Sequence, residues 1–522
     1  MTIEELVGSR LVFGIPGTVI TPEIVKHFQE THAGGLILYR INFESPDQLR
    51  KLISDLENAL GRRLLVTCDH EGGRVIMFGG GVTVFPSNQA IGKTGNTQLA
   101  RQQGEQEGRE LRRLGIDVNF APVLDVLTEA YSPNIGIRSY GADPDLVAKM
   151  GAARLSAMQV EGVSACAKHF PGLGPATLDP HLKLPTIQST WQDIEKNHFI
   201  PFSRAMRTAV HSIMTSHPLY PNLDPTPKTP ATFSRKIVYD YLRKGTGYKG
   251  VIFSDDLEMG AIREICSIGE AAVKTAEAGH DMILACHDLQ AQKEVYQALV
   301  EAYKSNRLAR KELDESLQRI DMLKGRRTAR FSPLPATEAR ARKENDDAQA
   351  LVKQICDLSA TTLKPGTALA NSATTAILFP RLSKLADKIM IEPEQLDEAA
   401  WLNQEWSSKT TIDPDLQSAG VTIGLYDIDP TTEQIPAAAA AAAGAEQTLL
   451  FLFDAHIYPS EKQLLEAVQA ASKNLIVVLL RDVYDQEYVK DGTLCLTNYG
   501  FRVCDIQAVL RKLVSPTAVP AQ

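Results

Sequence analysis

The run KHFPGLGPATLDPH at residues 168–181 concentrates groups that can do chemistry. It holds one lysine, two histidines and one aspartate, together with three prolines and two glycines. Proline and glycine at this density do not fit a core strand, so the run predicts a loop. The loop follows directly on the apolar run VSACAKHF at residues 163–170, which places its first titratable side chains at the end of a buried strand.

Other polar residues also follow apolar runs. They are Asp69, Glu71 and Arg74 in CDHEGGR, Asp125 in PVLDV, His217 in TSH, and Asp255 and Asp256 in FSDD. Any one of them, taken alone, is better explained as a cap on the helix that follows. Several polar strand ends meeting at one edge would instead suit a polyhydroxy ligand, with acid–base work at one of its bonds.

A metal site is the alternative interpretation of these groups. The residues with suitable ligand types are His169, Asp179, His181, His217 and Asp255. However, the sequence has no HxH at its first apolar run, no HExxH and no CxxC pair. We therefore expect no metal and no other cofactor.

Eight short apolar runs in the first 290 residues would position these groups. They lie at 10–15, 34–39, 64–69, 116–123, 163–170, 211–217, 250–256 and 281–286. Amphipathic segments separate them, several opening with Ser, Asn or Asp, which cap helices. Eight buried strands alternating with helices predict a (β/α)8 barrel of the TIM type, in which the C-terminal strand ends form the active face. An open doubly wound sheet is disfavoured because no early GxGxxG run is present.

The remaining length predicts a second domain. A chain of 522 residues is too long for one ordinary core. We expect the barrel domain to span residues 1–330, with one long basic helix over 289–327, and a proline-containing, charged linker over 331–349. Residues 350–522 predict a smaller C-terminal α/β domain of unassigned role. Its strand-like runs lie at 374–380, 420–427, 448–454, 474–481 and 492–498.

Composition narrows the partners and the compartment. The net charge of -8, without a block of Lys or Arg, argues against nucleic acid and anionic membrane as partners. The acidic N-terminus does not resemble a signal peptide, and no window is long enough for a membrane span. The seven scattered cysteines are typical of reduced thiols, so we expect a cytoplasmic protein.

Five motifs, in order, carry a resemblance to a known family. They are DHEGGRV, NFAPVLDV, NIGIRSYG, KHFPGLG followed by DPH, and GVIFSDDLEMGAI. Together they resemble the β-N-acetylglucosaminidases of glycoside hydrolase family 3, the NagZ type, across the barrel half of the chain. The resemblance implies a (β/α)8 barrel accompanied by a smaller C-terminal α/β sandwich domain. It also implies a retaining exo-hydrolase that releases terminal β-linked N-acetylglucosamine through a covalent glycosyl-enzyme. Its substrate would be a small oligosaccharide or muropeptide from peptidoglycan or chitin-type material.

The resemblance also implies roles for individual residues. Asp255 would be the nucleophile, His181 the general acid/base and Asp179 its partner. A histidine suits this role because it titrates near neutral pH, and a nearby carboxylate can orient the imidazole. The residues that would bind the sugar next to the scissile bond are Asp69, Arg138, Lys168 and His169.

Two positions depart from the family's motifs and bear on the preferred sugar and aglycone. Leu173 stands where the family usually has a second histidine, and Ile76-Met77 stand where an arginine commonly follows GGRV. Two alternative functions are therefore kept. One is a family 3 β-glucosidase, which usually takes its acid/base from the second domain, and the other is a non-catalytic sugar-binding barrel.

In the second domain, Asp454 and His456 of FDAHIYP follow a predicted strand. We interpret them as a cap at the strand end rather than as part of the barrel's site. The sequence specifies neither the oligomeric state nor the natural aglycone.

Overall fold

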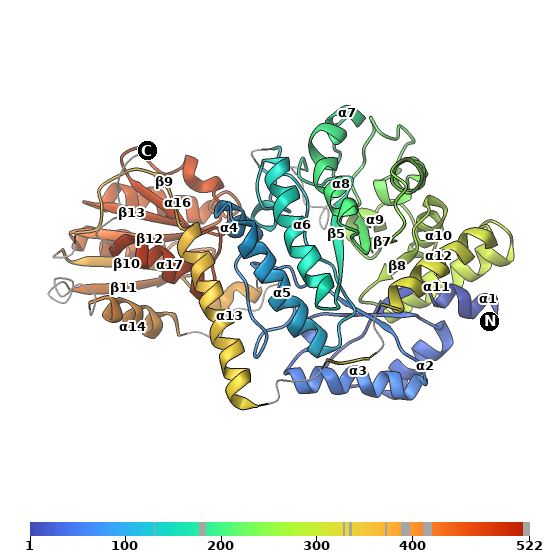
Figure 1. Cartoon of the computed structure of the whole chain (residues 1–522). Coiled ribbons are helices and arrows are strands. Elements are labelled where there is room, and N and C mark those ends of the chain that lie inside the picture. Colours follow the sequence, from blue (N-terminus) through green and yellow to red (C-terminus); the bar gives the residue numbers. More distant parts are fainter. Residues whose placement is uncertain are drawn as a thin grey trace. The chain divides into compact units, whose positions relative to one another are not determined.

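The structure is a computed structural model that describes residues 1–129, 131–176, 184–326, 329–332, 337–370, 373–387, 397–410 and 420–514. The chain divides into two compact units (Figure 1). The first comprises Met1–Phe85 and Gly95–Leu351, and the second comprises Pro86–Thr94 and Val352–Gln522.

Eight parallel strands close into a barrel in the first unit (Figure 1). They are β1 (Leu11–Gly14), β2 (Gly35–Leu38), β3 (Leu65–Cys68), β4 (Val118–Asn119), β5 (Ser164–Phe170), β6 (Ser212–Thr215), β7 (Val251–Asp256) and β8 (Met282–Ala285). Each predicted apolar run contains one of them, and β8 pairs with β1 to close the barrel. The predicted (β/α)8 fold is confirmed.

The barrel strands are buried on both faces, as parallel strands between helices must be. Every strand residue is buried except Asp255, which is partly exposed near the C-terminal end of β7. Inside the barrel, Phe120 and Phe253 meet edge to face with ring centroids 5.1 Å apart. The apolar runs therefore build the core, and the exception marks a polar strand end.

Helices surround the barrel, and side-chain caps start several of them at Thr21, Ser45, Asn96, Asp143, Ser267 and Asp288. They are α1 (Ile3–Gly8), α2 (Pro22–Thr31), α3 (Pro46–Leu60), α5 (Thr97–Leu114), α6 (Pro144–Val160), α7 (Trp191–Asp193), α8 (Phe199–Arg207), η5 (Lys236–Gly245), α9 (Gly260–Arg263), α10 (Ile268–Ala278), α11 (Leu289–Lys304) and α12 (Arg310–Lys324). Among the described helices, none is long and apolar enough to cross a membrane.

The single long helix predicted over 289–327 is wrong. Helix α11 ends at Lys304 and α12 begins at Arg310. Between them Asn306 has a φ of 60°, a left-handed conformation that ends a right-handed helix. The break lets α12 turn back, so that its Ile320 and Leu323 join the barrel core.

The second unit contains a six-stranded sheet in the order β11-β10-β12-β13-β14-β9. Its strands are β9 (Thr361–Lys364), β10 (Thr375–Pro380), β11 (Val421–Tyr426), β12 (Gln447–Phe453), β13 (Leu475–Leu480) and β14 (Leu494–Thr497). Each of the five predicted runs coincides with one of β10 to β14, which are parallel, although β12 begins one residue before its run, at Gln447. The short edge strand β9 runs antiparallel to β14 and was not predicted.

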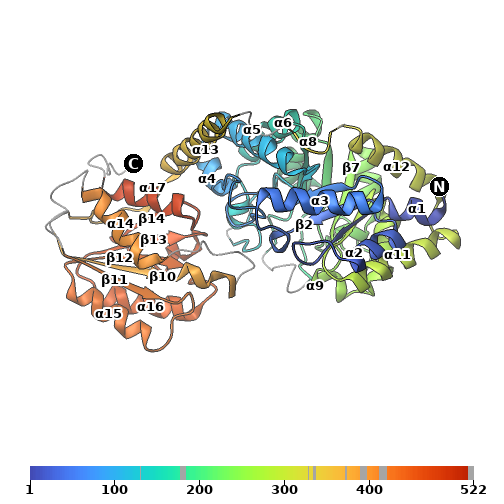
Figure 2. The same ribbon diagram turned by 90° about the horizontal axis from the view of Figure 1, so that it is seen from below.

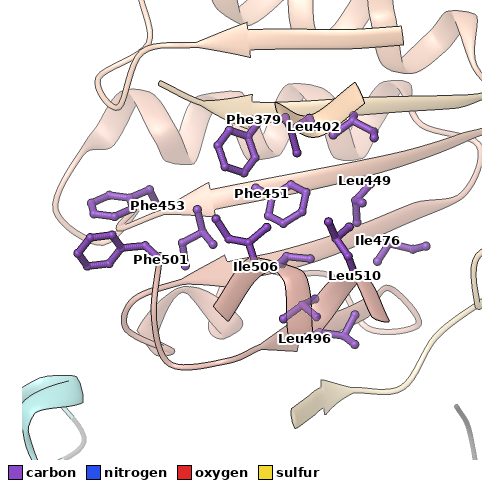
Figure 3. Packing of buried hydrophobic residues seen from close by; sticks show 14 of the residues in the cluster. Phe379, Leu402, Leu449, Phe451, Phe453, Ile476, Leu496, Phe501, Ile506 and Leu510 are labelled. Atoms are coloured by element: carbon purple, nitrogen blue, oxygen red, sulfur yellow. The ribbon is translucent and has the colours of Figure 1, made fainter. Parts of the chain in front are cut away.

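Helices cover both faces of this sheet (Figure 2). Helices α14 (Glu398–Thr410) and α17 (Val503–Val514) pack on one face, and α15 (Gln434–Gly444) and α16 (Pro459–Ala471) pack on the other. Figure 3 shows the core on the first face, where Phe379 and Phe451 stand edge to face at 5.0 Å. The predicted smaller α/β domain is therefore confirmed as a three-layer unit.

Helix α13 (Glu338–Ser359) occupies most of the stretch predicted as a linker. Its buried residues recur at helical spacing and include Ala348, Val352 and Ile355. On its exposed side, Lys343 pairs with Asp347, four residues along, with Nζ and Oδ2 2.6 Å apart. Dense charge in this stretch is thus the solvent face of a helix.

Candidate active site

Asp255 is the carboxylate that β7 presents at the C-terminal end of the barrel. Its Oδ1 accepts a hydrogen bond from the backbone N–H of Asp256 at 2.8 Å. Burial raises the pKa of the Asp255 carboxyl. Attraction by His217 and Lys168, together with this hydrogen bond, outweighs burial and lowers the pKa below its ordinary value. The side chain is therefore a carboxylate at neutral pH, the form that a nucleophile requires.

His217, buried at the end of β6, lies next to this carboxylate. Its Nε2 is 2.8 Å from the backbone oxygen of Asp256, and its Nδ1 is 2.8 Å from Thr232 Oγ1. The Thr232 hydroxyl itself donates to the carbonyl of Ser216 at 2.8 Å, so Thr232 Oγ1 accepts from the histidine. We infer that both ring nitrogens donate and that the ring is positively charged. Neither nitrogen is placed to bind a metal.

Glu71 is the centre of a buried ion network after β3. Its carboxylate accepts two hydrogen bonds from Arg138, from Nε at 2.8 Å and from Nη2 at 2.7 Å. Lys168 Nζ lies 2.6 Å from Glu71 Oε1 and 2.5 Å from Asp69 Oδ1. Burial raises the pKa of Glu71, but the charges of Arg138 and Lys168 outweigh it and hold the pKa well below its usual range. Glu71 therefore fixes both cations in place as a permanent anion.

Asp69 is the most exposed member of this network. Its side chain is 20% exposed, whereas that of Lys168 is 2% exposed. Burial raises the pKa of Asp69 even though Lys168 lowers it. The pKa of Lys168 is itself raised, because Asp69 and Glu71 outweigh its burial. The network thus offers a partly exposed oxygen beside a firmly held ammonium group.

His169 is held by Asp125. The imidazole Nδ1 lies 2.7 Å from Asp125 Oδ2, and the backbone N–H of His169 donates to the same oxygen at 3.2 Å. On the other side of the ring, Arg138 Nη2 lies 3.3 Å from Nε2. Because a carboxylate only accepts and a guanidinium only donates, Nδ1 carries the proton and Nε2 accepts. This tautomer leaves no ring nitrogen of His169 placed to bind a metal.

The same aspartate anchors the root of the loop. Oδ1 of Asp125 accepts the backbone N–H of Leu173 at 2.6 Å. Gly172 has a φ of 132°, and a Cβ there would lie 2.6 Å from the Cβ of His198. A Cβ at Gly174 would lie 1.8 Å from the carbonyl oxygen of Val126. The glycines of FPGLG are therefore required by close packing around Asp125.

The predicted acid/base His181 and its predicted partner Asp179 lie outside the described residues. The description of this run stops at Ala176 and resumes at Leu184.

The other five predicted site residues are brought to one end of the barrel. Direct contacts link Asp69 to Lys168 and Arg138 to His169, and Asp255 interacts electrostatically with Lys168. The contacts between these residues are consistent with a shared sugar site, and their individual roles remain predictions.

Two central residues had not been assigned to the site from the sequence, namely Glu71 and Asp125. Both lie at the ends of apolar runs, in CDHEGGR and PVLDV, and this position in the sequence could have indicated that they belong to the site. A third, Arg154, lies within α6 and carried no such signal. It is fully buried, pairs with Glu107 at 2.9 Å, and donates to the backbone oxygen of Glu71 at 2.8 Å.

Asp256 faces away from this network. Its Oδ1 accepts the backbone N–H of Glu258 at 3.1 Å, and its Oδ2 lies 3.5 Å from His287 Nε2. Burial raises the pKa of its carboxyl to about 7. Asp256 therefore supports the turn after β7, and Asp255 is the better candidate for a reacting carboxylate.

The two positions that depart from the family's motifs take part in packing. Leu173 is buried, at 3% exposed, and Ile76 is 8% exposed. The backbone N–H of Met77 donates to Nδ1 of His70 at 3.3 Å. Both apolar replacements therefore fill space beside the loops that carry the site.

A cavity of about 810 Å³ lies elsewhere on the barrel. Its lining includes His211, just before β6, and Val251, the first residue of β7, together with Arg319 and Leu323 of α12. These positions mark the N-terminal ends of the strands, whereas barrel enzymes place their chemistry at the C-terminal ends. The cavity contains none of the predicted site residues.

The chain is similar to known proteins in both sequence and structure. Residues 6–323 match the family model of the glycosyl hydrolase family 3 N-terminal domain. The chain is similar to the beta-hexosaminidase of Nitrosomonas eutropha, with 37% identity over 295 residues, which cover 55% of this chain and 84% of that protein. A family 3 beta-N-acetylglucosaminidase from Paenibacillus sp. str. FPU-7 has a similar structure, with a TM-score of 0.88, 30% identity, and coverage of 98% of this chain and 97% of that one. NagZ from Neisseria gonorrhoeae, in complex with N-trifluoroacetyl-D-glucosamine, gives a TM-score of 0.55 at 28% identity, covering 67% and 98%.

Proposed function

The chain belongs to glycosyl hydrolase family 3, and we propose that it is a retaining exo-β-N-acetylglucosaminidase. The proposal is supported above all by the environment of Asp255. This partly exposed carboxylate, with a lowered pKa, lies beside cations at the C-terminal end of the barrel. A nucleophile that must attack a sugar carbon needs this combination of charge and access.

In the first step, Asp255 attacks the anomeric carbon of the terminal sugar. The bond from this carbon to the leaving oxygen breaks as His181 donates a proton to that oxygen. In the second step, His181 removes a proton from water, and the water oxygen displaces Asp255 from the sugar. Two displacements at one carbon return the original configuration, which makes the enzyme retaining.

The charge of His217 assists both steps. Before attack, it helps to keep Asp255 ionised. In the second step, the same charge stabilises the carboxylate as it leaves the sugar. Because His217 is fixed by Thr232 and by the backbone oxygen of Asp256, its contribution needs no rearrangement during the reaction.

Sugar binding is proposed for Asp69, Arg138, Lys168 and His169. Asp69 accepts hydrogen bonds from hydroxyl groups, and Lys168 and Arg138 donate to sugar oxygens. Glu71 and Asp125 hold these donors from behind and do not themselves touch the sugar. The resulting rigidity favours one orientation of the sugar over Asp255.

The acid/base role of His181, with Asp179 as its partner, rests on the DPH motif. Support comes from the described root of the same loop, which Asp125 ties to the site through the N–H groups of His169 and Leu173. A β-glucosidase or a non-catalytic sugar-binding barrel is the alternative. The motif favours the hexosaminidase, because family 3 β-glucosidases usually lack the Asp-x-His loop.

We further propose residues 1–330 as the catalytic domain and peptidoglycan or chitin-type fragments as the source of substrate. The similar structure of a family 3 beta-N-acetylglucosaminidase supports a substrate with an N-acetylated amino sugar. A cytoplasmic location is proposed because none of the seven cysteines forms a disulfide, as is usual in a reducing compartment.

Product analysis tests the proposal. The purified chain should release N-acetylglucosamine from a peptidoglycan-derived disaccharide or from chitobiose, and should leave cellobiose intact. It should also cleave p-nitrophenyl N-acetyl-β-glucosaminide much faster than the β-glucoside. Equal or faster cleavage of the glucoside would favour the β-glucosidase alternative, and sugar binding without product would favour the non-catalytic barrel.

A further inference from the structure

A second cluster of titratable side chains lies in the second unit, where β12 and β13 end. Asp454 directly follows Phe453, the last residue of β12, which is labelled in Figure 3. Arg481 and Asp482 directly follow β13, and His456 lies in the turn before α16. Asp454 is 0% exposed, and Arg481 and Asp482 are 3% and 2% exposed. Burial of this many ionisable groups requires a compensating partner.

Three of these side chains converge. Asp454, His456 and Asp482 each offer one potential ligand atom, and these atoms all lie within 4.8 Å of one another. Two carboxylate oxygens and one imidazole nitrogen form a ligand set that divalent transition metals accept.

The carboxylate of Asp454 is not used as a cap. The backbone carbonyl of Asp454 accepts the N–H groups of Ile457 and Tyr458, at 2.8 and 3.0 Å, and so makes the turn. Oδ1 of the carboxylate has no hydrogen-bond partner among the described residues. Arg481 approaches only the other oxygen, with Nη2 2.9 Å from Oδ2. Buried Oδ1 therefore remains for another ligand.

His456 is oriented as a metal-binding histidine is. Its Nδ1 lies 2.8 Å from Asp485 Oδ1, and the same oxygen accepts the backbone N–H of His456 at 2.7 Å. The other oxygen of Asp485 accepts the N–H of Ala455 at 2.7 Å. A carboxylate that holds one nitrogen of the ring fixes the tautomer and presents Nε2 as the ligand.

Charge in the cluster is unbalanced. Four buried carboxyl groups face the single guanidinium of Arg481 and the imidazole of His456. The carboxyl groups belong to Asp454, Glu461, Asp482 and Asp485. A bound dication would supply the missing positive charge.

The position in the sheet is also one where ligands bind. Strand β10 lies between β11 and β12, so the chain moves to one side of β10 first and to the other side afterwards. In parallel sheets with helices on both faces, ligands bind beyond the carboxyl ends of the strands at this reversal. Asp454 lies at the carboxyl end of β12, next to the reversal.

We propose that Asp454, His456 and Asp482 bind one divalent transition-metal ion of the zinc class, with Asp485 as the positioning residue for His456. Arg481 holds Asp454 and Asp482 through their Oδ2 atoms, at 2.9 and 3.0 Å. Water completes the coordination of the ion. The site is separate from the barrel's sugar site in residues and in chemistry, and its effect is to stabilise the second unit.

Titration of the full, chelator-treated chain with Zn²⁺ and Co²⁺ tests this site. We expect one equivalent to bind with micromolar or tighter affinity and to raise the melting temperature. The Co²⁺ form should lack the near-ultraviolet band of a thiolate ligand, which separates this cluster from Cys356, Cys504 and Asp505, the other group with metal-ligand side chains among the described residues.

Variants locate the ion. His456→Gln and Asp482→Asn should each weaken binding at least 10-fold, and Asp485→Asn, which keeps all three ligands, should weaken it about 10- to 100-fold. Cys504→Ser and His181→Ala are matched controls that should still bind one equivalent of the metal ion. The proposal would be overturned if His456→Gln and Asp482→Asn bound the metal ion as tightly as the unsubstituted chain. It would also be overturned if either control lost metal binding, or if the unsubstituted chain bound no metal ion. Circular dichroism of each variant confirms its fold, and Asp485→Asn remains informative if a ligand variant fails to fold.

Discussion

Asp125→Asn should impair catalysis without removing any group that touches substrate. In the structure, the carboxylate accepts three hydrogen bonds, two from His169 and one from Leu173. An asparagine has one oxygen and one NH₂ group, so it can satisfy only part of this set. If its oxygen faces Leu173, its NH₂ group faces Nδ1 of His169. That ring must then carry its proton on Nε2, where it meets the donor Nη2 of Arg138 at 3.3 Å.

The expected size follows from these bonds. A charge-assisted hydrogen bond contributes about 1.5–3 kcal/mol, and a buried donor left without a partner costs about 1–3 kcal/mol. The total is thus about 2.5–6 kcal/mol. If about half of this free energy is lost from the stabilisation of the transition state, kcat/KM falls roughly 30-fold, because 1.36 kcal/mol corresponds to a factor of ten in rate. The rest appears as a lower melting temperature.

The assay is hydrolysis of p-nitrophenyl N-acetyl-β-glucosaminide by purified variants. Asp281→Asn is the matched control, because Asp281 is an equally buried carboxylate that accepts Arg243 Nη2 at 2.6 Å and Arg319 Nε at 2.9 Å. It lies just before β8, at the opposite end of the barrel. It should lower the melting temperature and leave kcat/KM unchanged. Equal losses of kcat/KM in both variants, or none in Asp125→Asn, would refute a positioning role for Asp125.

Three further expectations concern the acid/base, metals and pH. His181→Ala should slow hydrolysis of a substrate with a sugar leaving group about a hundred- to ten-thousand-fold, and hydrolysis of one with an activated aryl leaving group far less. Asp179→Ala should have a similar effect, and the double variant should be little worse than His181→Ala alone. An equal loss for both leaving groups, with reduced thermal stability, would indicate that the loop has only a structural role. EDTA should leave initial rates of aryl hydrolysis unchanged while lowering the melting temperature, and activity lost to EDTA and restored by zinc would contradict this. The pKa of Glu71 in the folded chain is lowered from 4.5, so its carboxylate stabilises the fold above pH 4.5 and this contribution is lost as the pH falls. Between pH 7 and pH 3 the melting temperature should therefore fall less steeply for Glu71→Gln than for the unsubstituted chain. Parallel curves for the two proteins would contradict this prediction.

The barrel could be predicted from the sequence because its parallel strands are buried on both faces. Such strands read as short apolar runs, and each run held one strand. Strand β9 was missed because Thr361–Lys364 is a partly exposed edge strand with polar residues. Helix α13 was missed because its charged solvent face masked the buried residues at Val352 and Ile355. Burial, rather than local propensity, therefore decided which elements could be predicted from the sequence.

The site was predictable to a similar degree. Polar residues at strand ends marked the region, and the ordered motifs identified Asp255 and the residues expected to bind sugar. The network could not be predicted, because Glu71 and Arg138 are 67 residues apart in sequence and meet only in the closed barrel. The proton on Nδ1 of His169 depends on Asp125 and Arg138, from two further segments. Such contacts follow from the tertiary structure alone.

The central claim is that Asp255 forms a covalent bond to the sugar. The most direct measurement is to inactivate the chain with an activated 2-deoxy-2-fluoro glycoside, digest it and locate the added sugar by mass spectrometry. We predict one sugar per chain, attached to the peptide that contains Ser254 to Leu257 and assigned by fragmentation to Asp255. Asp255→Asn should remain unlabelled and should have lost hydrolysis. An adduct on Asp256 or Asp69 would contradict the account.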